Sequence, residues 1–298
     1  MKEALRAILP PQFIRREEPL SKHTSFRIGG PAEWMVFPQN RQDLAELLRL
    51  AKERGVETRI LGAGTNVLVP DEGLRGLVIC LRDSLRGVTL LEGNRMEAMA
   101  GMTLAQTAMF AARNGLSGLE FAHGIPGTVG GGLYMNAGAY GGELKDVTLR
   151  TEFLTAEGEF MWLEGEKQGF SYRNSAFQTM NGVIVRAEFQ LTPSTEQAVR
   201  DRIYALNEKR RASQPLELPS AGSTFKRPAQ GYAAALIEQA GLKGLSVGGA
   251  QVSVKHSGFV VNTGGATAAD VLALVALVQE KVYAHSGIML EPEVRLWK

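Results

Sequence analysis

The stretch 118–142, GLEFAHGIPGTVGGGLYMNAGAYGG, holds the residue types and spacing that most directly suggest chemistry. Nine of its residues are glycine, and glycine weakens the interior of a helix or strand. This density therefore indicates main chain that turns tightly or lies directly against a ligand. Within the stretch, Ile125–Gly131 combines a proline, several glycines and the hydroxyl of Thr128, and successive N–H groups in such a turn form a concave anion site. A tight connection between two packed elements is the alternative interpretation.

The first glycine loop of the chain, GAGTN at 62–66, follows a predicted strand at 58–61, and Ile125–Gly131 is the second. It begins like a dinucleotide fingerprint but lacks the third glycine, and the residues after it are typical of a strand and a turn. The arrangement that places a pyrophosphate on a helix N-terminus is therefore not expected here. The pattern favours a phosphate cradle between strands, formed by main-chain N–H groups and the side chains of Thr65 and Asn66.

Three polar residues stand in contexts that suggest a use in catalysis. Arg173 lies in a turn-like loop (SYRNSAF), Ser223 lies among small residues (AGSTFK), and Glu293 lies in the pattern of the last strand (LEPEVR). Each has a plainer interpretation: a surface arginine, a turn serine, and an edge-strand carboxylate paired with Arg295. Because they are far apart in sequence, only the fold could bring them together.

Composition limits the class of protein. A chain of 298 residues is long enough for two or three domains, and 44% hydrophobic with 21% charged residues is ordinary for a soluble globular protein. The net charge of +2 gives no long-range attraction to nucleic acid or membrane, so neither is an expected partner. The one cysteine, Cys80, is predicted to be a core residue, which excludes a disulfide framework and a cysteine metal site. No metal is expected.

The N-terminal segment lacks the apolar run of a signal peptide, and no run approaches membrane-spanning length, so we expect a cytoplasmic protein. Periodicity and capping residues predict mixed helices and strands. Helices are expected at 40–54 (capped by Asn40 with Asp43), 103–113 (Thr103 with Gln106), 194–212 (Ser194 with Gln197), 232–240 and 267–285 (Thr267 with Asp270). Strands are expected at 33–38, 58–61, 76–81, 95–100, 183–191, 248–254, 258–262 and 290–296, with a hairpin at 147–164.

Several of these motifs, in this order, resemble the family of UDP-N-acetylenolpyruvoylglucosamine reductases. The resemblance covers nearly the whole chain, through HTSFRIGGPA, LGAGTNVLVPDEG, GLEFAHGIPGTVGGGLYMNAGAYGGE, SYRNSAF, RRASQPLELPSAGSTFKRP and LEPEVR. It implies an α+β fold, with a two-part FAD-binding unit of the vanillyl-alcohol-oxidase (PCMH) type and a C-terminal α+β substrate-binding domain. The implied domains are 1–85 and 86–192 for FAD and 193–298 for substrate, with the last strand returning toward the active site.

The resemblance also implies a role for individual residues. Arg173, Ser223 and Glu293 match the family's catalytic arginine, serine and glutamate. Non-covalent FAD would be bound by two loops whose residues are Gly62, Ala63, Gly64, Thr65, Asn66, Ile125, Pro126, Gly127, Thr128, Gly130 and Gly131. Substrate contacts are expected from Tyr172, and, on charge and location, from Lys226, Arg227, Gln251 and Lys255.

The implied reaction belongs to peptidoglycan synthesis. NADPH reduces FAD, and hydride then passes to the enolpyruvyl ether of UDP-N-acetylglucosamine to give UDP-N-acetylmuramate. Arg173 suits the substrate carboxylate because its planar, permanently charged fork can bind two oxygens. Ser223 would donate the proton as a general acid. Glu293 cannot stabilise an anion while ionised, so we expect it to be protonated, linked through water, or orienting a neighbour.

Two features separate this chain from the longer, type I members of the family. No inserted segment carries a tyrosine loop over the substrate, so the chain is similar to the shorter type II members. Arg227 stands where the longer form has asparagine. The sequence suggests a monomer or a weak oligomer whose ligands are NADPH and the UDP-linked enolpyruvyl sugar. The alternatives are an FAD-dependent oxidase of the same fold, for which His123 beside the glycine loop is a potential tether, and a non-catalytic flavin-binding module.

Overall fold

The computed structural model describes residues 1–298, which pack into two compact units. The first unit consists of Met1–Arg16, Trp34–Ala63 and Arg75–Lys209. The second consists of Glu17–Glu33, Gly64–Leu74 and Arg210–Lys298. Each unit is thus assembled from three segments of chain, and the glycine loop at 62–66 crosses from one unit to the other between Ala63 and Gly64.

The helices form where apolar periodicity and capping residues predict them. Asn40 and Thr103 accept hydrogen bonds from the N–H groups of Asp43 and Gln106, and Thr267 with Asp270 forms a complete capping box. Two further helices, α1 and α4, were not predicted from the sequence. The helices are α1 (Lys2–Ile8), α2 (Arg41–Glu53), α3 (Leu104–Arg113), α4 (Val129–Tyr134), α5 (Glu196–Ser213), α6 (Ala233–Gln239) and α7 (Ala268–Ser286).

The cap predicted for α5 was wrong. The N–H of Ser194 donates to the carbonyl of Gly115 at 2.7 Å, which keeps Ser194 in extended chain. The hydroxyl of Thr195 instead accepts the N–H of Ala198 at 3.2 Å. The helix therefore begins one residue later than a cap at Ser194 would place it, because a long-range backbone hydrogen bond competes with the local cap.

A four-stranded sheet in the order β1-β2-β5-β3 packs against α2. Its strands are β1 (Ile14–Pro19), β2 (Pro31–Val36), β5 (Leu74–Cys80) and β3 (Thr58–Leu61). Strands β3 and β5 run parallel, from Thr58 opposite Leu77 to Leu61 opposite Cys80. This pairing fixes the point at which β3 ends and the first glycine loop begins.

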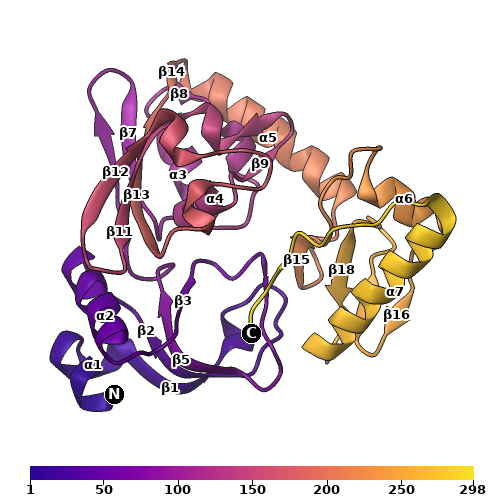
Figure 1. Ribbon diagram of the computed structural model, residues 1–298. Coiled ribbons are helices and arrows are strands. Elements are labelled where there is room, and N and C mark those ends of the chain that lie inside the picture. The colour runs from indigo at the N-terminus through magenta and orange to yellow at the C-terminus, as the bar shows by residue number, and fades with distance from the viewer. The chain divides into compact units, whose positions relative to one another are not determined.

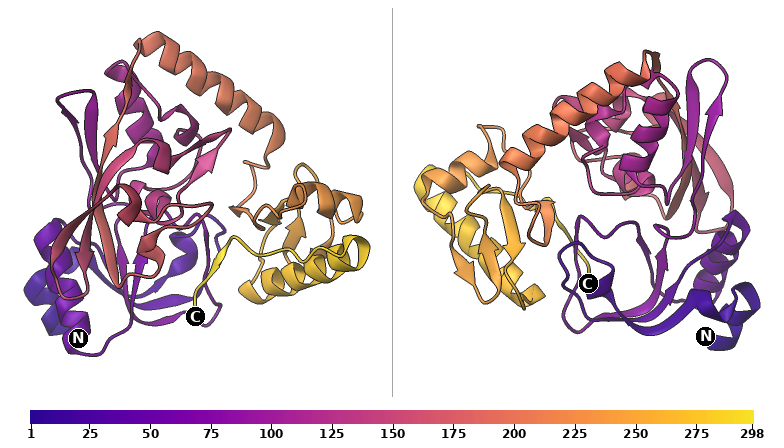
Figure 2. Two further views of the ribbon diagram at one scale, coloured as in Figure 1. Left: turned by 45° about the horizontal axis from the view of Figure 1, so that its top comes forward. Right: turned by 180° about the vertical axis from the view of Figure 1, so that it is seen from behind.

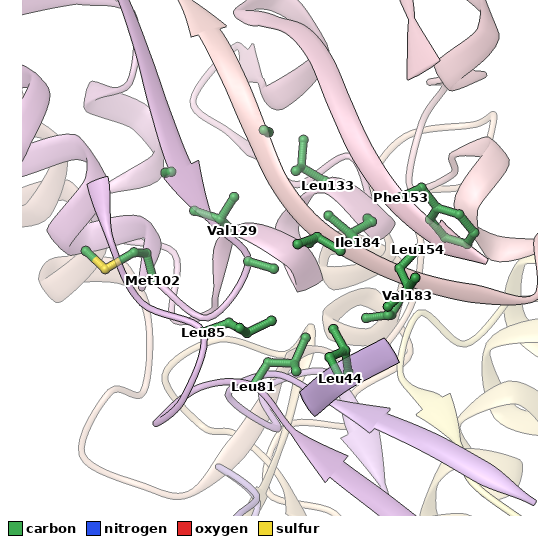
Figure 3. Packing of buried hydrophobic residues seen from close by; sticks show 14 of the residues in the cluster. Leu44, Leu81, Leu85, Met102, Val129, Leu133, Phe153, Leu154, Val183 and Ile184 are labelled. Carbon is green, nitrogen blue, oxygen red and sulfur yellow. The ribbon is translucent and has the colours of Figure 1, made fainter. Parts of the chain in front are cut away.

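A five-stranded antiparallel sheet in the order β12-β11-β13-β7-β6 forms the other half of the first unit's core. Helix α4 packs on β13 and β7, and Figure 3 shows Val129 and Leu133 of this helix beside Ile184 of β13. The strands are β12 (Phe160–Glu164), β11 (Thr148–Thr155), β13 (Gly182–Gln190), β7 (Arg95–Met99) and β6 (Val88–Leu91), with the short pairs β9 (Gly138–Ala139) and β10 (Gly142–Glu143), and β8 (Leu116–Ser117) and β14 (Thr192–Pro193). The sheet thus supports the second glycine loop through α4.

The second unit is built on a four-stranded antiparallel sheet in the order β15-β18-β17-β16. Helix α7 packs on β16 and β17 and contacts α6, and their apolar faces form a separate core (Figure 1). Both views of Figure 2 show the yellow α7 against the strands of this sheet. The strands are β15 (Ser220–Ser223), β18 (Phe259–Asn262), β17 (Ala250–Val252) and β16 (Ser246–Val247).

The last predicted strand, 290–296, is mostly irregular in the structure. Only β19 (Arg295–Leu296) is a strand, and it pairs in parallel with β4 (Val67–Leu68). Before it, Pro292 forms an isolated antiparallel bridge with Phe225. The segment changes partner within three residues, so its backbone cannot follow one continuous ladder.

Candidate functional site

The first glycine loop leaves five main-chain donors available. None of the N–H groups of residues 62–66 donates a hydrogen bond within the chain. Gly64 is buried at φ +63°, and a Cβ there would collide with the main-chain oxygen of His23. A buried N–H without an acceptor is unfavourable. The loop therefore has the properties of an anion cradle that is completed by a ligand.

The second glycine loop leads into α4, a helix that was not predicted from the sequence. Thr128 is the N-cap of α4, and its Oγ1 accepts the N–H of Gly131 at 3.3 Å. The N–H groups of Val129 and Gly130 donate to the carbonyls of Met102 and Ala100 at 2.8 and 2.9 Å. The first three N–H groups of the helix are thus already used.

Two donors remain in this second loop. The N–H groups of Gly127 and Thr128 have no acceptor within the chain, although Thr128 is only 1% exposed. The two loops also touch, since a Cβ on Gly62 would lie 2.5 Å from Thr128 Oγ1. Within the first unit, Gly62, Ala63, Gly127 and Thr128 thus present N–H groups from which a phosphate-containing cofactor can accept hydrogen bonds. This donor set fits the pyrophosphate of FAD.

Arg173 lies in the first unit, at a strained position in a tight turn. Ser171 and Asn174 exchange both backbone hydrogen bonds at 3.1 Å, so Tyr172 and Arg173 are the central residues of the turn. Arg173 has φ +54°, a conformation that is held only when its surroundings enforce it. Its Nη2 donates to the carbonyl of Gly138 at 3.2 Å, and its guanidinium lies 5.1 Å from the centroid of the exposed Tyr172 ring.

Asn136 supports this turn, although it was not among the site residues predicted from the sequence. Its side chain is fully buried and donates through Nδ2 to the carbonyl of Ser171 and to Glu143 Oε2, both at 2.9 Å. Its Oδ1 accepts the N–H of Lys145 at 2.9 Å. The sequence did offer one indication: Asn136 is an amide residue within a stretch of mostly small and apolar residues. Burying an amide side chain is unfavourable unless its hydrogen bonds are satisfied.

Glu143 is the charged group beside this turn. Burial raises the pKa of its carboxyl, but hydrogen bonds from Lys145 and Asn136, with the charges of Lys145 and Arg173, hold the pKa below its ordinary value. The carboxylate therefore stays ionised. Its charge complements the guanidinium of Arg173.

Ser223 and Glu293 come together in the second unit although 70 residues separate them in the chain. The N–H of Glu293 donates to the carbonyl of Thr224, the residue after Ser223, at 2.8 Å. Asn66 Nδ2 donates to the carbonyl of Glu293 at 3.3 Å. Ser223 is exposed and Glu293 is half-buried. The end of the first glycine loop, the serine and the glutamate are therefore neighbours.

The four further candidates for substrate contact also lie in the second unit, and each already has a partner. Lys226 pairs with Glu291 at 2.5 Å, and Lys255 Nζ donates to the carbonyl of Arg211 at 2.7 Å. The Arg227 guanidinium stacks on Tyr232, 4.1 Å from the ring centroid, and Gln251 donates to Ser246 Oγ at 3.0 Å. A bound phosphate would have to compete with these contacts.

Cys80 is a buried core residue, and His123 beside the second glycine loop has a side-chain partner. Cys80 is 2% exposed, and burial raises the pKa of its thiol to about 11. His123 Nδ1 lies 3.0 Å from Asn207 Nδ2. No group of three or more histidine, cysteine, aspartate or glutamate side chains is placed to bind a metal ion. No helix combines the length and apolar character needed to cross a membrane.

Comparison with protein families gives two matches. The C-terminal domain of UDP-N-acetylenolpyruvoylglucosamine reductase matches residues 214–297, and an FAD binding domain matches residues 32–164. The UDP-N-acetylenolpyruvoylglucosamine reductase of Syntrophomonas wolfei is 43% identical over 288 residues, covering 97% of this chain and 96% of the relative. That of Caldanaerobacter subterraneus is 44% identical over 294 residues, covering 99% and 97%.

Solved structures agree with these matches. The crystal structure of the UDP-N-acetylenolpyruvylglucosamine reductase from Thermus caldophilus has a TM-score of 0.81 and 35% identity, covering 96% of this chain and 100% of that chain. The Bermuda grass isoallergen BG60 has a TM-score of 0.51 at 15% identity, covering 65% and 44%, and shows likeness of fold alone. The predicted fold class, a two-part FAD-binding unit with a C-terminal α+β domain, is confirmed.

Proposed function

Because the chain belongs to the UDP-N-acetylenolpyruvoylglucosamine reductase family, we propose that it reduces the enolpyruvyl ether of UDP-N-acetylglucosamine to UDP-N-acetylmuramate. NADPH is the electron donor and FAD is bound without a covalent bond. The observation that carries the proposal is the position of Glu293, held by hydrogen bonds between Asn66 of the first glycine loop and the residue after Ser223. This reaction supplies a precursor of peptidoglycan.

FAD, when bound, supplies the hydride that reduces the terminal carbon of the enolpyruvyl double bond. The chain must then stabilise negative charge on the adjacent carbon and its carboxylate. Arg173 is suited to the carboxylate, because a guanidinium binds two oxygens and remains charged. The strained backbone at Arg173 and its contacts to Gly138 and Tyr172 fix this side chain before substrate arrives.

Ser223 donates the proton that completes the reduction. Its Oγ–H bond breaks, a C–H bond forms on the carbon next to the carboxylate, and the serine oxygen recovers a proton afterwards. The exposure of Ser223 supports this role because the hydroxyl can reach a ligand. Glu293 assists while protonated, through water, or by orienting a neighbour.

The loops at 62–66 and 125–131 bind the FAD phosphates. Unpaired N–H groups in both loops support this assignment. Gly130 lets α4 pack closely, since a Cβ on Gly130 would lie 3.0 Å from Ala100 Cβ, whereas a Cβ on Gly131 would meet only Thr128 Oγ1 at 3.4 Å. Tyr172, Lys226, Arg227, Gln251 and Lys255 contact the substrate or NADPH.

The family matches also support a three-part organisation, with residues 1–85 and 86–192 for FAD and 193–298 for substrate. The FAD binding domain match at 32–164 and the C-terminal match at 214–297 fall on these parts. We place the enzyme in the cytoplasm, where NADPH and UDP-sugars are available, as a monomer or weak oligomer.

Anaerobic stopped-flow spectroscopy of the flavin tests the proposal. Wild-type protein loaded with FAD should bleach with NADPH and recover its colour with the enolpyruvyl substrate. Ser223→Ala should bleach at the wild-type rate and recover about 100- to 10,000-fold more slowly. Ser286→Ala removes a serine hydroxyl bonded to Val282 at the end of α7 and is the matched control. It should behave as wild type.

Three outcomes would contradict the proposal. Equal slowing of both half-reactions in Ser223→Ala would remove the proton-donor role. Colour that returns only with air would indicate an oxidase. Protein that cannot be loaded with FAD would overturn the cofactor assignment.

A further inference from the structure

Strand β15 contains one residue more than its partner strand requires. Ser220 pairs with Val261 and Ser223 pairs with Phe259, so three steps along β15 match two steps along β18. This mismatch defines a β-bulge between Ser220 and Ser223. Bulges change the direction of side chains and are frequent next to active sites.

Gly222 is the residue that accommodates the bulge. Its φ is +76°, and a Cβ built on it finds nothing within 4 Å. Glycine is therefore favoured here by its left-handed backbone conformation, and not by a lack of room for a side chain. A left-handed conformation is readily adopted by glycine and costs other residues strain.

The bulge decides which way Ser223 faces. In a regular strand, residues two apart lie on the same face. Ala221 is 3% exposed, so Ser223 would share its buried face if the strand were regular. Instead Ser223 is exposed while the next residue, Thr224, is 2% exposed. The extra residue thus turns the serine hydroxyl away from the core.

Thr224 holds the backbone immediately after the bulge. Its N–H donates to the carbonyl of Gly258 at 2.9 Å, and its Oγ1 accepts the N–H of Val260 at 2.9 Å. Its carbonyl accepts the N–H of Glu293 at 2.8 Å. These three hydrogen bonds prevent the strand from relaxing into a regular register, and one of them also places Glu293.

We propose that the bulge at Gly222 is the device that positions the proton donor, and that Gly222 is a positioning residue for the reaction. This inference rests on the proposed function of Ser223. A side chain at residue 222 would favour a regular strand and rotate Ser223 toward the face of Ala221. The serine would remain in the chain, but its hydroxyl would leave the position from which it can donate.

Gly222→Val tests this inference, because a β-branched residue strongly disfavours the left-handed conformation. Gly287→Val is the matched control: Gly287 follows α7 in the same unit, has φ +70°, and is also open to a Cβ. Both variants should lose similar stability in urea unfolding. Reduction of FAD by NADPH should stay within about twofold of wild type in both. Recovery of colour with enolpyruvyl substrate should fall about 100-fold in Gly222→Val only.

Gly222→Asn provides a second, milder variant, because asparagine tolerates the left-handed region better than most residues other than glycine. It should recover colour at least tenfold faster than Gly222→Val. The double variant of Gly222→Val and Ser223→Ala should recover no more slowly than Ser223→Ala alone, because the bulge acts through the serine.

Three results would overturn the inference: wild-type recovery in Gly222→Val, equal slowing in Gly287→Val, or additive losses in the double variant. If Gly222→Val does not fold, equal recovery in Gly222→Asn and Gly222→Ala overturns it instead. Wild-type protein that never recovers colour with substrate would contradict the proposed function itself, and the two failures are therefore distinguishable.

Discussion

Replacing Asn136 with alanine should weaken both the fold of the first unit and the turn that carries Arg173. Asn136 makes three side-chain hydrogen bonds at 2.9 Å and is fully buried. At about 1 kcal/mol each, these bonds contribute about 3 kcal/mol. Asn136 also has φ +42°, where alanine adds about 1 kcal/mol of strain. The expected loss of unfolding free energy is therefore about 4 kcal/mol.

Two measurements separate the loss of stability in Asn136→Ala from the displacement of Arg173. Urea unfolding followed by tryptophan fluorescence gives the stability loss. Asn94→Ala is the control, since Asn94 is exposed with φ +60° and should lose only the strain part, about 1 kcal/mol. In stopped-flow experiments, Asn136→Ala should recover flavin colour with substrate about 10- to 100-fold more slowly, because a misplaced Arg173 no longer meets the carboxylate.

Flavin reduction by NADPH should change far less in the same variant. The reasoning would be refuted if Asn136→Ala were no less stable than Asn94→Ala. It would also be refuted if the variant recovered colour at the wild-type rate, because the hydrogen bond to Ser171 would then have no role in placing the turn.

Three further predictions concern the cofactor loop, a carboxylate and the thiol. Gly64→Ala should abolish retention of FAD through gel filtration, since the added Cβ collides with the main-chain oxygen of His23 and displaces the loop. A yellow protein peak would contradict the prediction that this loop binds FAD. The lowered pKa of Glu143 means that its carboxylate stabilises the fold above the pKa of the unfolded state, and this contribution is lost as pH falls through the lower pKa of the folded state. In Glu143→Gln, the free energy of unfolding in urea should therefore fall less steeply below about pH 4.5 than in the wild type; an unchanged fall would argue against this role. Cys80, with its pKa raised to about 11, should resist iodoacetamide at pH 8 in the folded protein and react in urea, as followed by mass spectrometry; rapid labelling of folded protein would show that the thiol is accessible.

Local chemistry in the sequence was sufficient to predict most helices. Asn40, Thr103 and Thr267 cap the helices that follow them, because capping needs only a side chain and an N–H three residues away. Ser194 failed as a cap because a backbone bond to Gly115, outside its own helix, holds it in extended chain. The same kind of long-range pairing divides the segment 290–296 between two partners.

Short motifs in the sequence are enough to identify the types of group in the candidate site: two glycine loops, an arginine, a serine and a glutamate. What those groups can do depends on the folded chain. Only long-range backbone bonds bring Glu293 to Thr224 and Asn66, and only pairing with β18 creates the bulge that turns Ser223 outward. Asn136 gains its role from the buried partners around it. Capping is a property of a few neighbouring residues, whereas side-chain direction and burial depend on segments far away in the chain.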